Sequence, residues 1–272
     1  PGEPSWSSPW GEGRPGWHIE CSTMSMKYLG ETFDFHGGGS DLIFPHHENE
    51  IAQSEGCTGC HPFVKYWLHN GFITVNEEKM SKSLGNFFMV IDILEHYEPE
   101  TLRFFILPTH YRSPLDFSDE RLAEAPRSLS RLKTAQENLQ ALMALMNAGP
   151  TEESLKLRRK VLELRNEFME AMRDDFNTAL AISHMFALAK EINIYHQSIV
   201  SVGSKPDGKL VSILQSVFSE MCSIIGVLES TQGAVEAESC GLEEPLMEML
   251  IAMRQEARSN KDYAQADALR NK

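Results

Sequence analysis

The spacing of apolar residues changes near residue 120, and this change constrains the fold more than any other feature of the chain. Before it, short alternating runs at residues 17–21 and 33–36 predict strands, and residues 25–30 predict a helix that ends at glycine. From Arg121 onward apolar residues recur every three or four positions, as in Leu129, Leu132, Leu139, Leu142, Met143 and Met146. We therefore predict an α/β layer with parallel strands, followed by an all-α antiparallel helical bundle.

Capping residues and a proline indicate where the later helices begin. Thr151 precedes acidic residues, Asn177 precedes a second apolar series, and Pro245 stands where the first residue of a helix belongs. Residues 203–209 contain Gly, Pro and Asp and predict a loop. After Thr151, one side of the helix is predicted to carry Leu155, Val161, Leu162, Phe168, Met169 and Met172.

Composition is that of a globular chain of one or two domains, with 272 residues of which 42% are hydrophobic and 24% charged. The uncharged run at residues 176–189 is too short to span a bilayer, and the chain does not open with a basic segment followed by an apolar block. We expect a cytoplasmic protein without a membrane anchor. Because the chain opens on a Pro-, Gly- and Ser-rich run without Met, we also expect a piece of a longer protein.

The net charge of −14 disfavours a nucleic-acid partner on charge alone, since phosphate binding normally requires a basic face. A basic cluster at residues 156–160 is interpreted as a solvated helix face. Five cysteines, an odd number, favour reduced thiols. Cys57, Cys60 and His61 match a haem-attachment pattern, which needs an exported chain, so we expect two free thiols in a loop.

Residues 36–50, HGGGSDLIFPHHENE, concentrate the reactive side chains of the first half. His46 and Glu50 are four apart on a helix predicted after Pro45, so they share a face on which a metal ion could be bound. Cys21, at the end of the strand predicted at residues 17–21, would complete a donor set that favours zinc. A simple helix-end pair, or acid/base chemistry by His47 and Glu48, is the alternative.

Two glycine-containing loops point to a nucleotide. Gly37, Gly38 and Gly39 follow a predicted strand and let the backbone approach a nucleotide, and Asp41 could accept from ribose hydroxyls. Lys79 and Lys82 lie three apart before Gly85, in a loop that could neutralise a triphosphate. A flexible turn and an exposed basic turn are the respective alternatives.

Several strings together make the chain resemble the cysteinyl-tRNA synthetases. KMSKS at residues 79–83 is the loop of class I aminoacyl-tRNA synthetases, and GWHIECS (16–22), residues 36–55 and YWLHNGF (66–72) narrow the resemblance. DDFNTALA (174–181) and KDYAQADALR (261–270) extend it into the helical half. The implied activity is ATP-dependent ligation of L-cysteine to tRNA(Cys) through a cysteinyl adenylate.

The resemblance also implies roles for individual residues. Zinc, held by Cys21, His46 and Glu50, would select the substrate thiol. Trp17 and His18 would line the amino-acid pocket. The adenosine of ATP, accompanied by Mg²⁺, would meet Gly37, Gly38, Gly39 and Asp41, and its phosphates would be stabilised by Lys82 with Lys79.

Two elements of the family pattern do not occur in residues 1–16, which contain neither His nor Cys: a His-x-Gly-His motif and a fourth zinc ligand. We therefore expect an incomplete, inactive portion of the enzyme, and we expect it to be a monomer. Residues 1–90 would be the second half of a Rossmann-like catalytic domain, 91–122 a stem-contact segment and 123–272 a DALR-type tRNA-binding domain. The alternatives are a cysteine ligase of mycothiol biosynthesis with an amino-sugar acceptor, which residues 256–270 disfavour, and a noncatalytic binding fragment.

Overall fold

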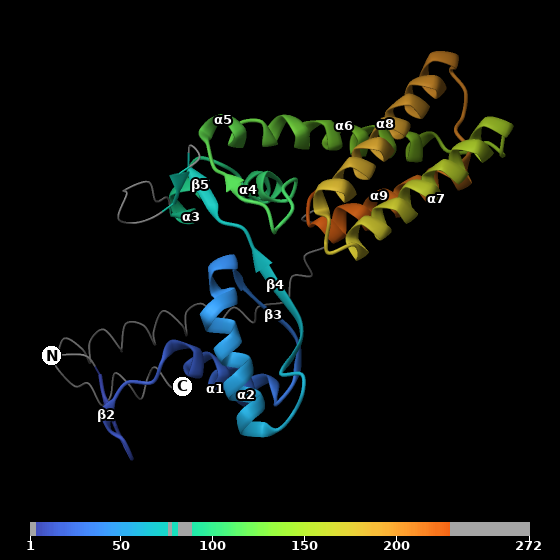
Figure 1. Ribbon diagram of the computed structural model, residues 1–272. Helices are drawn as coiled ribbons and strands as arrows, with labels where there is room; N and C mark the ends of the chain where they lie inside the picture. Colours follow the sequence, from blue (N-terminus) through green and yellow to red (C-terminus); the bar gives the residue numbers. More distant parts are fainter. Residues whose placement is uncertain (1–3, 76–77, 81–88, 229–272) are drawn as a thin grey trace, which may run out of the picture. The chain divides into compact units, whose positions relative to one another are not determined.

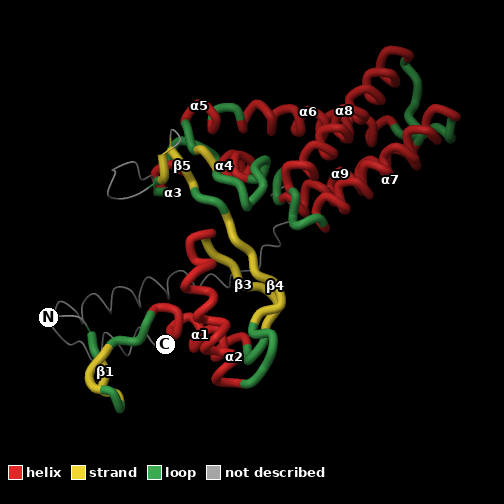
Figure 2. The backbone as a smooth tube through the Cα atoms, viewed as in Figure 1, coloured by secondary structure: helices red, strands yellow, loops and turns green. Residues whose placement is uncertain are grey.

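A computed structural model describes residues 4–75, 78–80 and 89–228 (Figure 1). The chain divides into two compact units, Pro1–Leu228 and Glu229–Lys272, and the second lies outside the described residues. The helix predicted at Pro245 and the string at residues 261–270 therefore lie outside them too. Within the first unit, strands occur in the earlier part and long helices follow residue 124, as Figure 2 shows.

Two parallel strands carry the α/β part. β3 (Phe33–Gly39) pairs with β4 (Val64–Asn70), with Phe33 opposite Val64 and Gly39 opposite Asn70. Their connection passes through the turns η1 (Ser40–Leu42) and η2 (Ile43–His47) and the helix α2 (Glu48–Thr58). Parallel strands need such a crossover, so the predicted parallel α/β arrangement is confirmed. An antiparallel hairpin of β1 (Trp6–Ser8) and β2 (Gly11–Gly13) precedes it.

The strand predicted at residues 17–21 is wrong, because this segment begins a helix. α1 (Trp17–Leu29) follows Gly16 and ends at Gly30, whose φ of 93° suits glycine. The alternation is only five residues long, and packing of α1 against α2 decides the structure instead. At their contact the fully buried Ser22 donates through Oγ to the Glu50 carbonyl oxygen at 3.4 Å.

The exposure of one face of the β3–β4 pair changes along the strands. Phe33, Phe63 and Val64 form a small buried cluster against which Met26 and Trp67 pack. Further along the strands, the rings of Phe35 and Tyr66 stack at 5.4 Å, yet these residues are 58% and 61% exposed. An aromatic pair therefore lies open on a parallel sheet.

A second, smaller sheet and three helices follow. β5 (Ile73–Val75) pairs antiparallel with β6 (Glu78–Lys79) and parallel with β7 (Leu115–Asp116). The helices are α3 (Val90–Leu94), α4 (Pro99–Ile106) and α5 (Asp119–Leu122). Phe104, Phe105 and Phe117 of this segment belong to the same core as the later helices.

Four long helices form the bundle: α6 (Ala125–Leu145), α7 (Glu152–Arg173), α8 (Thr178–Val202) and α9 (Gly208–Ile225). The predicted starts at Thr151 and Asn177 are confirmed, because their side chains accept hydrogen bonds from the backbone N–H groups of Ser154 and Leu180. The loop predicted at residues 203–209 is shorter, since α9 begins at Gly208.

The predicted apolar stripes are partly correct. Leu129, Leu132, Leu139 and Leu142 are buried, whereas Met143 and Met146 are 38% and 43% exposed. On α7, Val161 and Phe168 are buried while Leu155 and Leu162 are about half exposed. Each helical residue is rotated by about 100° from its neighbour, so a residue next to a buried one leaves the core face.

Of the described helices, α9 is long and apolar enough to cross a membrane by length and composition. Most of its apolar side chains lie instead in the bundle core, where eight of its residues are buried: Leu210, Val211, Leu214, Val217, Phe218, Met221, Cys222 and Ile225. Burial of this kind is typical of the central helix of a bundle.

Candidate metal and nucleotide site

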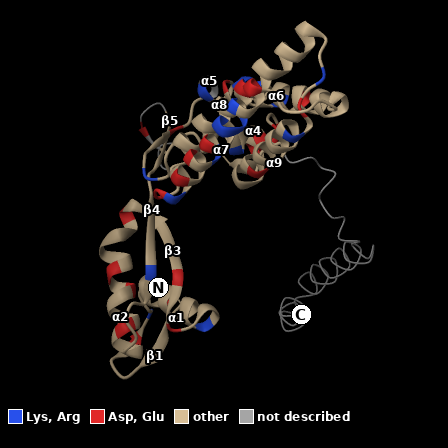
Figure 3. Cartoon of the chain, turned by 90° about the vertical axis from the view of Figure 1, so that its right-hand side faces the viewer, with Lys and Arg blue, Asp and Glu red and all other residues tan. Residues whose placement is uncertain are grey.

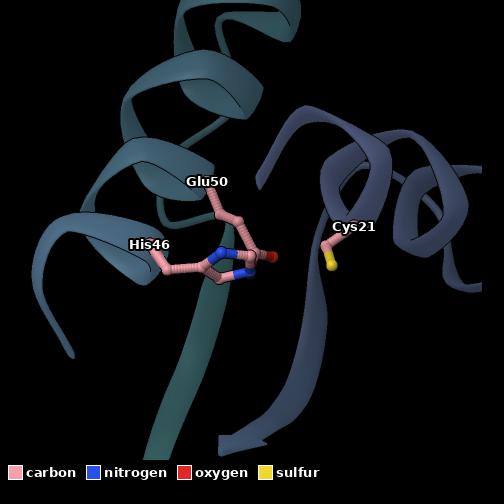
Figure 4. Close-up of side chains that lie close together, drawn as sticks. All are labelled: Cys21, His46 and Glu50. Atoms are coloured by element: carbon pink, nitrogen blue, oxygen red, sulfur yellow. The ribbon is translucent and has the colours of Figure 1, made fainter. Parts of the chain in front are cut away.

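Helices α1 and α2 bring three metal-ligating side chains together. One ligand atom each of Cys21, His46 and Glu50 lies within 4.8 Å of the others. Figure 4 shows these side chains pointing toward one another, Cys21 from α1 and the other two from the chain around the start of α2. His46 and Glu50 are one helical turn apart, as the sequence predicts, and the helical position of Cys21 still directs its thiol to them.

Glu50 lies at the centre of this site and is fully buried. Nε2 of His46 is 3.0 Å from Oε1, and Nε2 of His36 is 3.5 Å from Oε2, yet neither carboxylate oxygen accepts a properly oriented hydrogen bond. Burial raises the pKa of Glu50 to about 7. Burial, and then the charge of Glu50, also raises the pKa of the Cys21 thiol. Both shifts disfavour negative charge where no cation is present.

Further histidines surround the same carboxylate. His36, His47 and Glu50 form a second group whose ligand atoms lie within 4.8 Å of one another. Nδ1 of His47 is 2.8 Å from Nε2 of His69, and the rings of His36 and His47 each lie 4.8 Å from that of Trp67. Burial, followed by the three neighbouring imidazoles, lowers the pKa of His47 to about 4. The ring is therefore neutral near pH 7.

The donor set suits zinc. Thiol, imidazole and carboxylate are zinc ligands, whereas magnesium and calcium prefer oxygen alone. A buried carboxylate with two oxygens lacking hydrogen bonds is costly unless a cation or donor reaches it. Zinc would compensate Glu50 and favour the thiolate of Cys21 at once, so these residues fit the metal that the sequence resemblance implies.

Trp17 and His18, predicted to line an amino-acid pocket, lie beside the metal-ligating group. The Trp17 ring contacts the His46 ring edge-on at 4.5 Å, and the His18 ring lies 6.2 Å from it. Trp17 is 63% exposed. The first turn of α1 therefore borders the site on its solvent side.

The glycines predicted to meet a nucleotide end strand β3. A Cβ on Gly38 would come within 2.9 Å of Leu42 and 3.0 Å of His47, and one on Gly39 would overlap the Asp41 carboxylate. The buried His47 ring leaves little room for a side chain at position 38, whereas the exposed Asp41 carboxylate could rotate away from a Cβ at position 39. These glycines lie at the carboxyl end of parallel strands, where α/β folds bind ligands, and Asp41 is exposed there.

The lysine loop is described only in part. Lys79 lies in β6, where Thr74 is its partner on β5, and the Met80 N–H donates to the Ile73 carbonyl at 3.1 Å. Lys82 lies outside the described residues, so its predicted role stays a prediction.

Sequence reasoning did not single out His36 or His69, and it did not place His47 beside Glu50. The register of the two strands explains why these histidines meet: His36 in β3 is opposite Trp67 in β4, and Gly38 is opposite His69. Residues two apart on a strand share a face, which gathers these rings beneath α2. Cys57 and Cys60 have free thiols, as predicted, but the predicted loop is wrong for Cys57, which lies in the last turn of α2. The Cys60 thiol donates to Oε2 of Glu31 at 3.1 Å.

Comparisons with known proteins identify the family to which this chain is related. The family model of the tRNA synthetases class I (C) catalytic domain matches residues 1–127, and that of the DALR domain matches residues 167–229. A cysteine–tRNA ligase of Heliobacterium modesticaldum is 51% identical over 275 residues, covering all of this chain and 56% of that protein. One of Pelotomaculum thermopropionicum is 52% identical over 279 residues, covering all of this chain and 57% of that protein. The chain thus spans little more than half the length of these relatives.

Solved structures show the same fold at low identity. A LeuRS–tRNA–LeuAMS complex from Agrobacterium radiobacter matches with a TM-score of 0.56 and 15% identity, over 83% of this chain and 34% of that chain. A putative arginyl-tRNA synthetase from Campylobacter jejuni matches with a TM-score of 0.56 and 14% identity, over 79% and 51%. The catalytic-domain and DALR matches and the identity to the cysteine–tRNA ligases carry the assignment further: the chain belongs to the class I aminoacyl-tRNA synthetases, in the cysteine–tRNA ligase family.

Proposed function

We propose that this chain is part of an enzyme that ligates L-cysteine to tRNA(Cys) at the expense of ATP. In such a reaction the cysteine carboxylate attacks the α-phosphorus of ATP and pyrophosphate leaves. A terminal ribose hydroxyl of the tRNA then attacks the carbonyl carbon of the cysteinyl adenylate, and AMP leaves. The identity to cysteine–tRNA ligases along the whole chain and the DALR match, which favours tRNA as the acceptor, support this proposal.

The observation that carries the choice of cysteine is the group of Cys21, His46 and Glu50 around a buried carboxylate without hydrogen bonds. These three residues would hold zinc. When bound, zinc supplies a soft electrophilic centre that binds a thiolate far better than a hydroxyl, which would separate cysteine from serine. Glu50 would supply negative charge, and His46 would bind as a neutral imidazole because burial lowers its pKa.

Other residues would position the substrates. Trp17, packed on His46, would restrict water on the open side of the pocket, together with His18. The backbone at Gly37, Gly38 and Gly39 would approach the adenosine, whose ribose would be bound by Asp41. Lys79 and Lys82 would neutralise the phosphates, assisted by Mg²⁺.

The same proposal assigns the parts of the chain. Residues 1–90 would belong to the catalytic domain, residues 91–122 would contact the acceptor stem, and residues 123–272 would bind the rest of the tRNA. A hydrogen bond joins the segment 91–122 to the helical part: the Tyr111 hydroxyl donates to Oδ1 of Asp175 at 2.7 Å. The enzyme would act as a cytoplasmic monomer.

Zinc analysis of purified variants tests the ligand set. We expect wild type to bind about one zinc ion per chain, and Cys21→Ala and His46→Ala to bind zinc at least about 100-fold more weakly, since even an outer partner of a ligand is worth ten- to a hundredfold. His61→Ala is the matched control, because His61 lies after the end of α2, is exposed and contacts Glu55 instead of the metal-ligating group. It should leave zinc binding unchanged.

A fourth variant separates the two donor groups that share Glu50. His47→Ala removes a member of the second group only, so it should retain most of the zinc affinity. If His47→Ala lost zinc while Cys21→Ala kept it, the ligand set would be wrong. A wild-type chain that binds zinc but does not bind cysteine in preference to serine would contradict the role proposed for the metal.

A further inference from the structure

A groove between α6 and α8 is lined by cations and amides without a carboxylate. Its volume is about 230 Å³. Its cations are Arg131 from α6 and Lys190 from α8, and its amides are Asn193 and Gln197 from α8. Phe186 and Ile194 of α8 are apolar lining residues. In a chain of net charge −14, such a lining is a local reversal of sign.

The cations of this groove are not neutralised within the described part of the chain. Several other cations of the bundle have carboxylate partners: Lys156 with Glu152, Arg158 with Asp207, Arg165 with Glu220 and Arg173 with Glu170. Arg131 and Lys190 have no such ion pair among the described residues, nor has Arg127, one turn before Arg131. Glu191, the neighbour of Lys190, is engaged by Lys160 at 2.6 Å.

The groove is built on fixed contacts between helices. The Arg131 guanidinium lies 4.8 Å from the centre of the Phe186 ring, which orients its charge. Nδ2 of Asn138 on α6 donates to Oδ1 of Asn193 on α8 at 2.9 Å. Lys190 and Gln197 are two helical turns apart, about 10 Å along α8. The polar groups are therefore spread along a line instead of converging on one point.

Another groove in the bundle has the opposite character. It lies between α7 and α8, has a volume of about 460 Å³, and includes Glu153, Glu191 and Asp207 in its lining. Carboxylates there would repel phosphate. Positive charge without carboxylates thus distinguishes the α6–α8 groove, and Figure 3 shows how acidic and basic positions are otherwise mixed over these helices.

We propose that the α6–α8 groove binds the sugar–phosphate backbone of RNA. Arg131 and Lys190 would each neutralise a phosphate, and the amides of Asn193 and Gln197 would contact phosphate or ribose oxygens. The groove offers no exposed aromatic face on which a base could stack, because Arg131 covers Phe186, so it would position RNA without reading its sequence. The inference rests on the proposed function, which supplies tRNA(Cys) as the RNA.

Binding of a fluorescently labelled tRNA(Cys) transcript, measured between about 50 and 200 mM salt, tests the groove. The double variant Arg131→Gln/Lys190→Gln should bind roughly tenfold more weakly at the lower salt, and its slope of log affinity against log salt should fall by about 2. The control Arg159→Gln/Lys209→Gln removes two exposed charges of the same bundle outside the groove and should bind as wild type does.

Two results would overturn the proposal, and they are distinguishable. If wild type binds the transcript and the groove variant shows the same affinity and salt slope, or the control loses as much, the groove is not the contact surface. If wild type itself does not bind tRNA(Cys), the proposed function fails and the groove assignment fails with it. Equal helical circular dichroism of all variants shows that folding is unchanged.

Discussion

At the scale of single residues, Glu50 carries the strongest chemical constraint in the chain. Its carboxylate is fully buried, and its two oxygens face His46 and His36 without accepting a hydrogen bond. A buried charge in this state lowers the stability of the fold, because no hydrogen bond or opposite charge compensates its loss of hydration. The same carboxylate becomes favourable once a divalent cation is present. Stability and metal binding are therefore opposed at this position.

Replacing Glu50 by glutamine should expose this opposition. Without metal, at about pH 8 and with a chelator present, Glu50→Gln should raise the free energy of unfolding by about 1–3 kcal/mol, because a neutral amide replaces the buried charge. With zinc the order should reverse, since the variant loses a ligand. Urea unfolding with chelator and with zinc measures both differences.

Glu55→Gln is the control for this experiment. Glu55 lies on the same helix but accepts a hydrogen bond from the Phe63 N–H at 3.0 Å and contacts His61. Its replacement should lower stability slightly and leave the response to zinc intact. A Glu50→Gln variant that is less stable than wild type in chelator would refute the account of Glu50.

At the scale of elements, the start of α9 is held by a buried aspartate. Asp207 accepts from the backbone N–H groups of Lys209 and Leu210, from the Ser154 hydroxyl at 2.6 Å and from the Arg158 guanidinium. Burial alone would raise the pKa of Asp207, but the hydrogen bonds from Ser154, Arg158 and Leu210 lower it below the ordinary 3.8. One side chain thus caps α9 and ties it to α7.

The pH dependence of this tie has a definite sign. Because the pKa of Asp207 is lower in the folded than in the unfolded chain, its contribution to stability is present above pH 3.8 and is lost as pH falls through the folded value. Asp207→Asn keeps a capping oxygen but leaves Arg158 without its partner. We expect a loss of about 3 kcal/mol near neutral pH.

Urea unfolding near pH 7 and near pH 3 checks this expectation. The difference between wild type and Asp207→Asn should shrink at the lower pH. Glu152→Gln, which removes an exposed ion pair with Lys156 on α7, should change stability at neither pH. A difference that stays equal at both pH values would show that the ion pair does not contribute.

Whether the sequence could predict a feature depends on how far apart in the chain the interacting residues lie. The starts of α7 and α8 were predictable because Thr151 and Asn177 bond to backbone only three residues away. The convergence of His46 and Glu50 was predictable for the same reason, since helical geometry fixes positions four apart. The helix at Trp17 and the approach of His36 and His69 to the site were not, because they depend on packing between segments far apart in the chain.

At the scale of the whole molecule, the chain covers little more than half of its relatives' length, and its parallel sheet is small. Among the described residues, the sheet that bears the glycines consists of one parallel pair, β3–β4, and the parallel pair β5–β7 belongs to a separate sheet. Parallel sheets are normally covered on both faces, yet Phe35 and Tyr66 lie exposed on this one. Nucleotides bind such sheets in a crevice bordered by strands on both sides.

We therefore expect this chain by itself not to catalyse cysteine-dependent exchange between ATP and pyrophosphate. Gly37, Gly38 and Gly39 would contact a nucleotide from one side only, which loses the positioning on which adenylate formation depends. The assay is incorporation of labelled pyrophosphate into ATP with and without cysteine, and the cysteine–tRNA ligase of Heliobacterium modesticaldum is the positive control. Zinc and tRNA binding should persist in the same preparation, because Cys21, His46, Glu50 and the α6–α8 groove are all present. Cysteine-dependent exchange that disappears in Cys21→Ala would contradict the prediction and would mean that β3 and β4 suffice to build the nucleotide site.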